Sequence, residues 1–263
     1  NNYESPTKKK KKDLSHIFLN LNRNLNFENF YQSDLVLSLQ KVTDDTYLKV
    51  FNSHITKSIV GPDDANRLNN HLKVILNNDK INFDAGIETF EDLQLSKSDR
   101  FQYILPYYNF NKLINQDFFK GTIDFNSNGS NKITDTNKVS SNVVNNLNLN
   151  SKNFITNFGF DNSFGVSLKN LNSVGKNNAT YKSSPQVELM SIFNFDSSFP
   201  LINNSNNSTK LLKPKVSLRF NPSDMKDYSK SENKTDVSNI FSSNRLGFSD
   251  TFESGRSLTL GFD

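Results

Sequence analysis

The stretch KINFDAGIE, residues 80–88, places an apolar side chain at every second position. The two sets alternate one by one: Ile81, Phe83, Ala85 and Ile87 against Asn82, Asp84, Gly86 and Glu88. Successive side chains of a β-strand point to opposite faces, so this alternation predicts a strand with one apolar and one polar face.

The same alternation recurs along the rest of the chain. It is clear in FGVSLKN (164–170), PKVSLRF (214–220) and SLTLGFD (257–263), and weaker in GTIDF (121–125), QVELMSIFNF (186–195) and KNFITNFGF (152–160). Clusters rich in Asn, Ser, Gly and Asp lie between these segments and predict turns and loops. They are NSNGSNK (126–132), KNLNSVGKNNATYKSS (169–184), INNSNNSTK (202–210) and NPSDMKDYSKSENKTD (221–236).

One stretch, PDDANRLNNHLKVIL (62–76), has some helical character. Leu68, Leu72 and Ile75 have helical spacing, and a proline and two acids precede them. However, the stretch runs directly into the 80–88 segment, and its asparagines oppose helix formation. We therefore predict a strand here.

Composition excludes several classes of protein. Only 34% of the residues are hydrophobic, yet 23 Phe and 8 Tyr argue against a disordered chain. The absence of Cys excludes disulfides and thiolate metal sites. The net charge is +4, but the basic residues are scattered apart from Lys8–Lys12, unlike those of a nucleic-acid-binding protein.

Two architectures use two-faced strands of this kind. A β-sandwich buries the apolar faces between two sheets, whereas an outer-membrane barrel turns them to lipid and its polar faces to a wet interior. The predicted polar faces carry bulky charges, which favour the wet interior: Asp84, Glu88, Lys169, Lys215 and Arg219. We predict an all-β fold, an antiparallel transmembrane β-barrel, and keep the sandwich as the alternative.

Three segments, in order, resemble the outer-membrane LPS-assembly family LptD, in its alphaproteobacterial form. TDDTYLKVF (43–51) resembles the family's DDTYL signature, and 88–110 resembles its aromatic strand, short turn and proline-containing segment. The stretch 238–263 resembles its late Arg- and Gly-rich segment, and 211–224 lies between these anchors. The positions that carry the resemblance are Asp44, Asp45, Tyr47, Leu48, Pro106, Phe241, Arg245, Gly247, Asp250, Glu253, Gly255 and Gly261.

The resemblance implies that the chain is an internal piece of a larger barrel. Residues 1–12 would be a polar, basic loop or a cut end, and residues 13–263 would be an open portion of the barrel domain. It also implies lipopolysaccharide transport and assembly in the outer membrane of a Gram-negative bacterium, without catalysis or a cofactor. The implied partners are lipopolysaccharide, outer-membrane lipids, an LptE-like lipoprotein plug and an LptA-like periplasmic bridge, with no nucleic acid. The alternatives are another outer-membrane barrel, such as a porin or receptor, and a secreted β-sandwich that binds carbohydrate or surface partners.

Candidate sites are few. Asp44 and Asp45 could form a catalytic or metal-binding pair, but no third group lies nearby in sequence. We interpret them as a turn or rim pair with Tyr47 as an interfacial aromatic. Arg245, Glu253 and Arg256 could touch lipopolysaccharide or form an inward-facing polar network, and we favour the network.

The remaining basic and imidazole side chains give weaker signals. Lys8, Lys9, Lys10, Lys11 and Lys12 could contact anionic lipid, although a solvated tail is the plainer interpretation. His16, His54 and His71 are isolated in the sequence. No catalytic triad, phosphate loop or metal motif is evident, so the sequence predicts neither an enzyme nor a metal site.

Overall fold

The structure, a computed structural model, describes residues 14–55, 60–116, 120–205, 208–248 and 250–262. Its elements are β1 (His16–Asn24), β2 (Gln32–Val42), α1 (Tyr47–Val50), α2 (Asn52–Ile55), β3 (Arg67–Asn77), β4 (Ile81–Asp92), β5 (Phe101–Gln116), β6 (Gly121–Thr134), β7 (Lys138–Ser151), β8 (Phe154–Ile155), β9 (Asp161–Lys176), β10 (Gln186–Ser198), β11 (Leu201–Ser205), β12 (Ser208–Leu212), β13 (Pro214–Asn221) and β14 (Gly255–Phe262).

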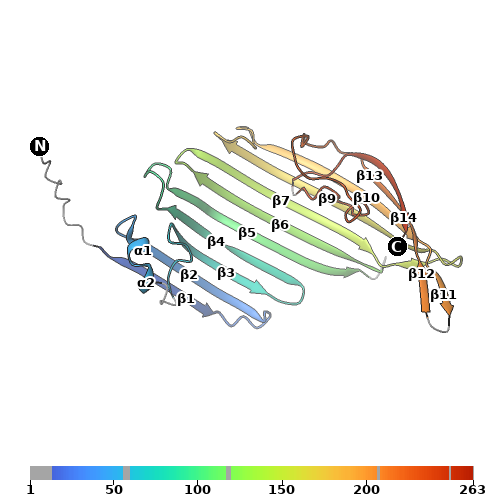
Figure 1. Cartoon of the computed structure of the whole chain (residues 1–263), viewed down its shortest axis with the longest axis horizontal. Coiled ribbons are helices and arrows are strands. Elements are labelled where there is room, and N and C mark those ends of the chain that lie inside the picture. Colours follow the sequence, from blue (N-terminus) through green and yellow to red (C-terminus); the bar gives the residue numbers. More distant parts are fainter. Residues whose placement is uncertain (1–13, 56–59, 117–119, 206–207, 249, 263) are drawn as a thin grey trace, which may run out of the picture.

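One large sheet dominates the molecule (Figure 1). Its strands follow the order β1-β2-β3-β4-β5-β6-β7-β9-β10-β13-β14, each antiparallel to its neighbours, and the short β8 pairs with β9. Strands β11 and β12 form a separate hairpin. Within the described residues, β1 and β14 each pair on one side, so the sheet is open. The prediction of an all-β, antiparallel, partial barrel sheet is confirmed.

The strand register places apolar side chains in continuous rows. Leu37, Leu72 and Ile87 are paired in sequence across β2, β3 and β4, and Val166 is paired with Phe193 across β9 and β10. Because side chains alternate along each strand, these rows share one side of the sheet, here called the apolar face. The opposite side, the polar face, carries Asn, Ser, Asp and Lys side chains.

The apolar face is uncovered. Leu189 is 72% exposed and Leu260 is 69% exposed, and large apolar side chains on most other strands are also exposed, though to a smaller extent. The described chain places no second sheet or helical layer against this face, so the sandwich alternative is wrong for this architecture. An exposed apolar surface of this extent marks contact with lipid or with another macromolecule.

Buried apolar side chains gather in two small clusters. Tyr47, Leu48, Leu68 and Leu93 pack together beside α1, and Met190, Ile192 and Phe252 form the second cluster. Within the residues that the structure describes, no helix has the length and apolar character needed to cross a bilayer.

Several element predictions are confirmed, and others need correction. The ambiguous stretch 62–76 forms a strand from Arg67 onward. However, 126–132 lies inside β6 rather than in a turn, and 169–176 lies inside β9. The stretch 152–160 contributes only the two-residue β8. The Asn- and Ser-rich stretches remain extended because their side chains pair across strands: Ser130 donates to Asn142 Oδ1 at 2.9 Å.

Candidate functional site

The connection 222–254, the longest in the described chain, packs on the polar face of the last strands. The loop returns to the sheet through polar contacts with β10 and β13. Ser223 Oγ accepts a hydrogen bond from the Ser191 amide at 3.1 Å, and Lys226 lies 3.4 Å from the Glu188 carboxylate. We call this connection, with the strand residues that it touches, the covered polar site.

Arg219 on β13 holds the loop from below. Its Nε donates to the Ser243 carbonyl at 2.8 Å, and its Nη2 donates to the Glu253 carbonyl at 2.5 Å. Asn221, two residues further on the same face, donates to the Glu253 carbonyl at 2.9 Å. Because side chains alternate along β13, Arg219 and Asn221 point to the same face. Together they bond to the loop at Ser243 and at Glu253.

Arg245 and Glu253 pair within the loop. Arg245 Nε lies 3.0 Å from Glu253 Oε2, and Nη2 lies 2.5 Å from Oε1, a two-pronged arrangement that fixes both groups. Arg245 and Glu253, two of the three residues expected to form a polar network, are therefore in contact with each other. Arg219 extends this pair, because its Nη1 lies 4.0 Å from the Glu253 carboxylate.

Asp250 is the centre of a second group of hydrogen bonds in the loop. Its carboxylate accepts hydrogen bonds from the Tyr228 hydroxyl at 2.6 Å and from Lys226 Nζ at 3.2 Å. Burial disfavours the charged carboxylate, but the bonds from Tyr228 and Lys226 outweigh it and lower the pKa of Asp250. Burial, followed by the bond to Asp250, raises the pKa of Tyr228. The Tyr228 ring also stacks on Phe248 with centroids 4.0 Å apart.

The base of the loop is sealed by buried side chains. Thr251 has no exposed surface, and Phe252 packs with Met190 and Ile192. The ammonium group of Lys169, on β9, lies 4.8 Å from the centre of the Phe252 ring, a cation–π arrangement. The loop is therefore a fixed cover over this part of the polar face.

Two glycines of the resemblance allow the loop its turns. Gly247 has φ +67° and Gly255 has φ +92°, a backbone region that side chains with a Cβ rarely adopt. Gly255 is also the first residue of β14, so the chain turns there as it re-enters the sheet. Pro106 lies in β5, at a register irregularity between β5 and β6.

Asp44, Asp45, Tyr47 and Leu48 lie far from the covered polar site, in the connection between β2 and β3. Asp44 caps a turn by accepting the Thr46 amide at 3.0 Å. Asp45 lies 2.8 Å from Arg100, a side chain only 9% exposed that also lies 3.3 Å from Glu91. The Asp45 carboxylate raises the pKa of Arg100 more than any other group.

Tyr47 differs from its interpretation as an interfacial aromatic. The structure places Tyr47 and Leu48 in short helix α1 and buries both in the first apolar cluster. The Tyr47 hydroxyl lies 2.6 Å from His16 Nδ1 on β1. The sequence missed this helix because the stretch was interpreted as a turn.

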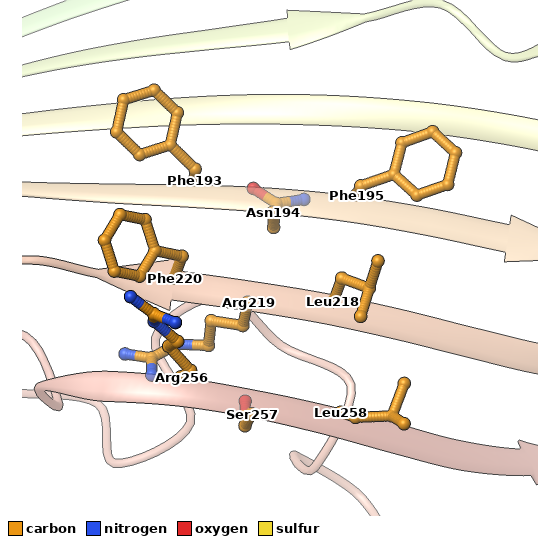
Figure 2. A pocket seen from close by; sticks show the side chains of 9 residues that line it. All are labelled: Phe193, Asn194, Phe195, Leu218, Arg219, Phe220, Arg256, Ser257 and Leu258. Carbon is orange, nitrogen blue, oxygen red and sulfur yellow. The ribbon is translucent and has the colours of Figure 1, made fainter.

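Arg256 does not join the inward network that was expected to include it. It follows Gly255 on β14, on the apolar face, and its guanidinium lies 5.3 Å from the centre of the Phe220 ring (Figure 2). Alternation separates Arg256 from Arg219, so the two cations serve opposite sides of one sheet. The sequence alternation of 257–263 could have indicated this orientation.

The remaining candidate sites are a metal site and the isolated lysine and histidine side chains. Among the described residues, no three His, Cys, Asp or Glu side chains gather as metal ligands. Lys8–Lys12 and the side chain of His54 lie outside the described part of the chain. The contacts described for the covered polar site hold the loop and its charged groups in place.

A comparison with models of known protein families identifies the family. The family model described as LptD, LPS transport system D, matches residues 15–263. No curated protein matches the chain.

Proposed function

The chain belongs to the LptD family of LPS transport proteins, and from this premise we propose that it forms part of the wall of an outer-membrane translocon. The family supports a role in lipopolysaccharide transport and assembly at the outer membrane. In our proposal, the apolar face meets the hydrocarbon of the bilayer and the polar face borders the wet interior through which lipopolysaccharide passes. The wall performs no catalysis.

One observation carries the proposal: a single layer of antiparallel strands separates an uncovered apolar face from a polar face. In lipid, every backbone group must be paired internally, and a sheet of hydrogen-bonded strands achieves this pairing except at its open edges. The described strands of 12–16 residues, such as β4 and β9, exceed the roughly 9–11 residues that cross a bilayer when tilted.

The partners follow from the same assignment. An LptE-like lipoprotein plug would occupy the interior against the polar face, and an LptA-like bridge would deliver lipopolysaccharide from the periplasm. Outer-membrane lipids would surround the apolar face. The covered polar site supports this division because Arg219 and Lys169 lie on the polar face, where both contact residues of the loop.

Depletion of the full-length protein in its native host tests the proposal. We expect lipopolysaccharide to accumulate short of the cell surface, measured as loss of surface staining while total lipopolysaccharide stays constant. Restoring the full-length protein from a plasmid should restore staining and serves as the control. Normal surface lipopolysaccharide after depletion would reject the assembly role.

A further inference from the structure

A groove opens on the apolar face beside Arg256, and Arg219, whose side chain belongs to the polar face, also contributes to its lining. Phe193, Phe195, Leu218, Phe220 and Leu258 supply its apolar lining, and Figure 2 shows Arg256 next to Phe220 at one end of this row of side chains. The space between them measures about 550 Å³. Phe193 and Phe220 are direct cross-strand partners, as are Phe195 and Leu218, so the strand register itself builds the walls.

Arg256 is an unusual residue for this position. Phe220 and Arg256 are paired across β13 and β14, and the guanidinium lies against the Phe220 ring. Arg256 is exposed, and no carboxylate pairs with it among the side chains that the structure describes. A guanidinium that lies against an aromatic ring is positioned by it while its outer N–H groups stay free to bind an anion.

The position of Arg256 along β14 indicates which leaflet of the outer membrane it faces. Arg256 is the second residue of β14, at the end of the sheet where the connections 43–66 and 222–254 lie. At the other end the longest connection is 199–213, which contains β11 and β12, and the remaining connections are shorter, such as 78–80 between β3 and β4. Outer-membrane barrels have their longer loops outside the cell and their short turns in the periplasm, so Arg256 belongs to the outer-leaflet side.

We propose that this groove binds lipopolysaccharide on the outer surface of the barrel wall. The Arg256 guanidinium pairs with a phosphate of lipid A, and an acyl chain of the same molecule lies against the aromatic and aliphatic side chains. This inference rests on the proposed function and adds a resting place for the lipid after it reaches the outer leaflet. Arginine suits the task because its fork of donors matches phosphate oxygens.

Other cations on the apolar face provide a contrast. Arg23 on β1 shares this face, since it follows Leu19 and Leu21 in the alternation, but it lies at the end of the sheet with the short turns. Lys41 on β2 lies at the same end as Arg256. Neither lines the groove, so charge on the apolar face can be separated from charge at the groove.

Photocrosslinking in the full-length protein tests the site. A benzoylphenylalanine replacing Leu258 should crosslink to lipopolysaccharide in growing cells, detected by a lipid A antibody on the purified protein. Adding Arg256→Ala should reduce that crosslink about tenfold, because a charge-assisted contact to phosphate is lost. Arg256→Lys should retain part of it, and Arg23→Ala should leave it unchanged.

A second arm uses the protein without the arginine substitution, so folding of a variant does not enter. With the crosslinker in place, the purified protein is placed in phosphatidylcholine vesicles that contain bisphosphorylated lipid A, phosphate-free lipid A or phosphatidylglycerol. We expect strong crosslinking to the bisphosphorylated form and at least tenfold less to the other two. Equal crosslinking to phosphate-free lipid A would overturn the role of Arg256, and equal crosslinking to phosphatidylglycerol would overturn the choice of ligand.

The outcome is separable from that of the depletion experiment. Loss of surface lipopolysaccharide on depletion, together with no crosslink at Leu258, would overturn the groove while leaving the transport role in place. Unchanged surface lipopolysaccharide on depletion would overturn the transport role itself.

Discussion

At the scale of single residues, the covered polar site shows how a charged side chain is kept inside a membrane protein. Arg219 is 5% exposed, and a buried charge is tolerated only when its donors are satisfied. Two loop carbonyls satisfy two of these donors, and Glu253 supplies the opposite charge. Arg219 Nη1 has no hydrogen-bond partner among the described residues and lies 4.0 Å from Glu253, so the two bonds from Nε and Nη2 are the ones that hold the loop on the sheet.

Replacing Arg219 with Ala should loosen the loop without unfolding the sheet. The lost hydrogen bonds from a charged donor should lower the free energy of loop opening by about 2 kcal/mol, or roughly thirtyfold faster cleavage by proteinase K within 229–236. Ser217→Ala is the control, since Ser217 is buried on the same face of β13 and no hydrogen bond joins its side chain to the described residues of the loop. Equal cleavage rates for the two variants would contradict the anchoring role.

The hydrogen bonds of Asp250 with Tyr228 and Lys226 predict a pH range in which the loop stays packed on the sheet. The folded pKa of Asp250 lies below its ordinary 3.8, so its contribution is present above that value and is lost as pH falls through the folded pKa. The folded pKa of Tyr228 lies above its ordinary 10.0, so its contribution is present below 10.0 and is lost as pH rises through the folded pKa.

A fluorophore on Glu232→Cys, in this cysteine-free chain, should report that window as high anisotropy between about pH 4 and 10. Anisotropy should fall at both extremes. Asp250→Asn should flatten the acid limb, and Tyr228→Phe should flatten the alkaline limb. If the fall in anisotropy at acid and at alkaline pH is unchanged in these variants, groups other than Asp250 and Tyr228 cause it.

At the scale of elements, the sequence predicted the strands in which apolar and polar residues alternate clearly. It missed or shortened other strands. β4, β9, β13 and β14 contain the segments with the clearest two-residue period. No strand was predicted for β7. β6 and β9 were cut short because the Asn and Ser residues of 126–132 and 169–176 were interpreted as turn formers. Their side chains instead bond across strands, a tertiary effect that no local pattern contains.

A polar ladder on the apolar face illustrates this effect. The Tyr108 hydroxyl bonds to Ser127 Oγ at 3.0 Å, and Ser127 donates to Asn145 Oδ1 at 2.7 Å. Asn145 Nδ2 then donates to Asn170 Oδ1 at 3.2 Å, and Asn172 donates to the same oxygen at 2.6 Å. Polar groups that face lipid need such partners, since no water is there to replace them.

Asn145→Ala should therefore destabilise the full-length barrel by about 1–2 kcal/mol, because it breaks two bonds of the ladder. The measurement is the temperature at which the protein loses its folded, fast-migrating form on a detergent gel. Asn148→Ala removes an amide from the polar face of the same strand and should shift that temperature less. A larger shift for Asn148→Ala than for Asn145→Ala would contradict this prediction, because it would mean that the polar face contributes the more stabilising contacts.

At the scale of the whole molecule, the decisive feature is what lies against the apolar face. A period of two is shared by sandwiches and barrels, so the sequence could favour the barrel only through its charged polar faces and the LptD resemblance. The structure separates the two because no described element covers the apolar rows. The covered polar site was beyond the sequence for a similar reason: Arg219 meets residues 24 and 34 positions away through a loop without periodicity.

Adjacent residues of β7 test the assignment of the two faces. Leu147 lies on the apolar face, in register with Leu168, and Asn148 lies on the polar face. In the membrane-embedded full-length protein, Asn148→Cys should react with a water-soluble maleimide at least tenfold faster than Leu147→Cys, and both should react equally after denaturation. Leu147 is 36% exposed in the chain itself, so its protection must come from a neighbour rather than from its own fold.

A quencher attached to lipid tails identifies that neighbour. A fluorophore on Leu147→Cys should be quenched by it, and one on Asn148→Cys should not, because only the apolar face touches hydrocarbon. Protection of Leu147→Cys without lipid quenching would mean that another protein surface covers this face. Faster labelling of Leu147→Cys than of Asn148→Cys would reverse the faces, and the translocon wall would then have its charged side toward lipid, which the cost of charge in hydrocarbon forbids.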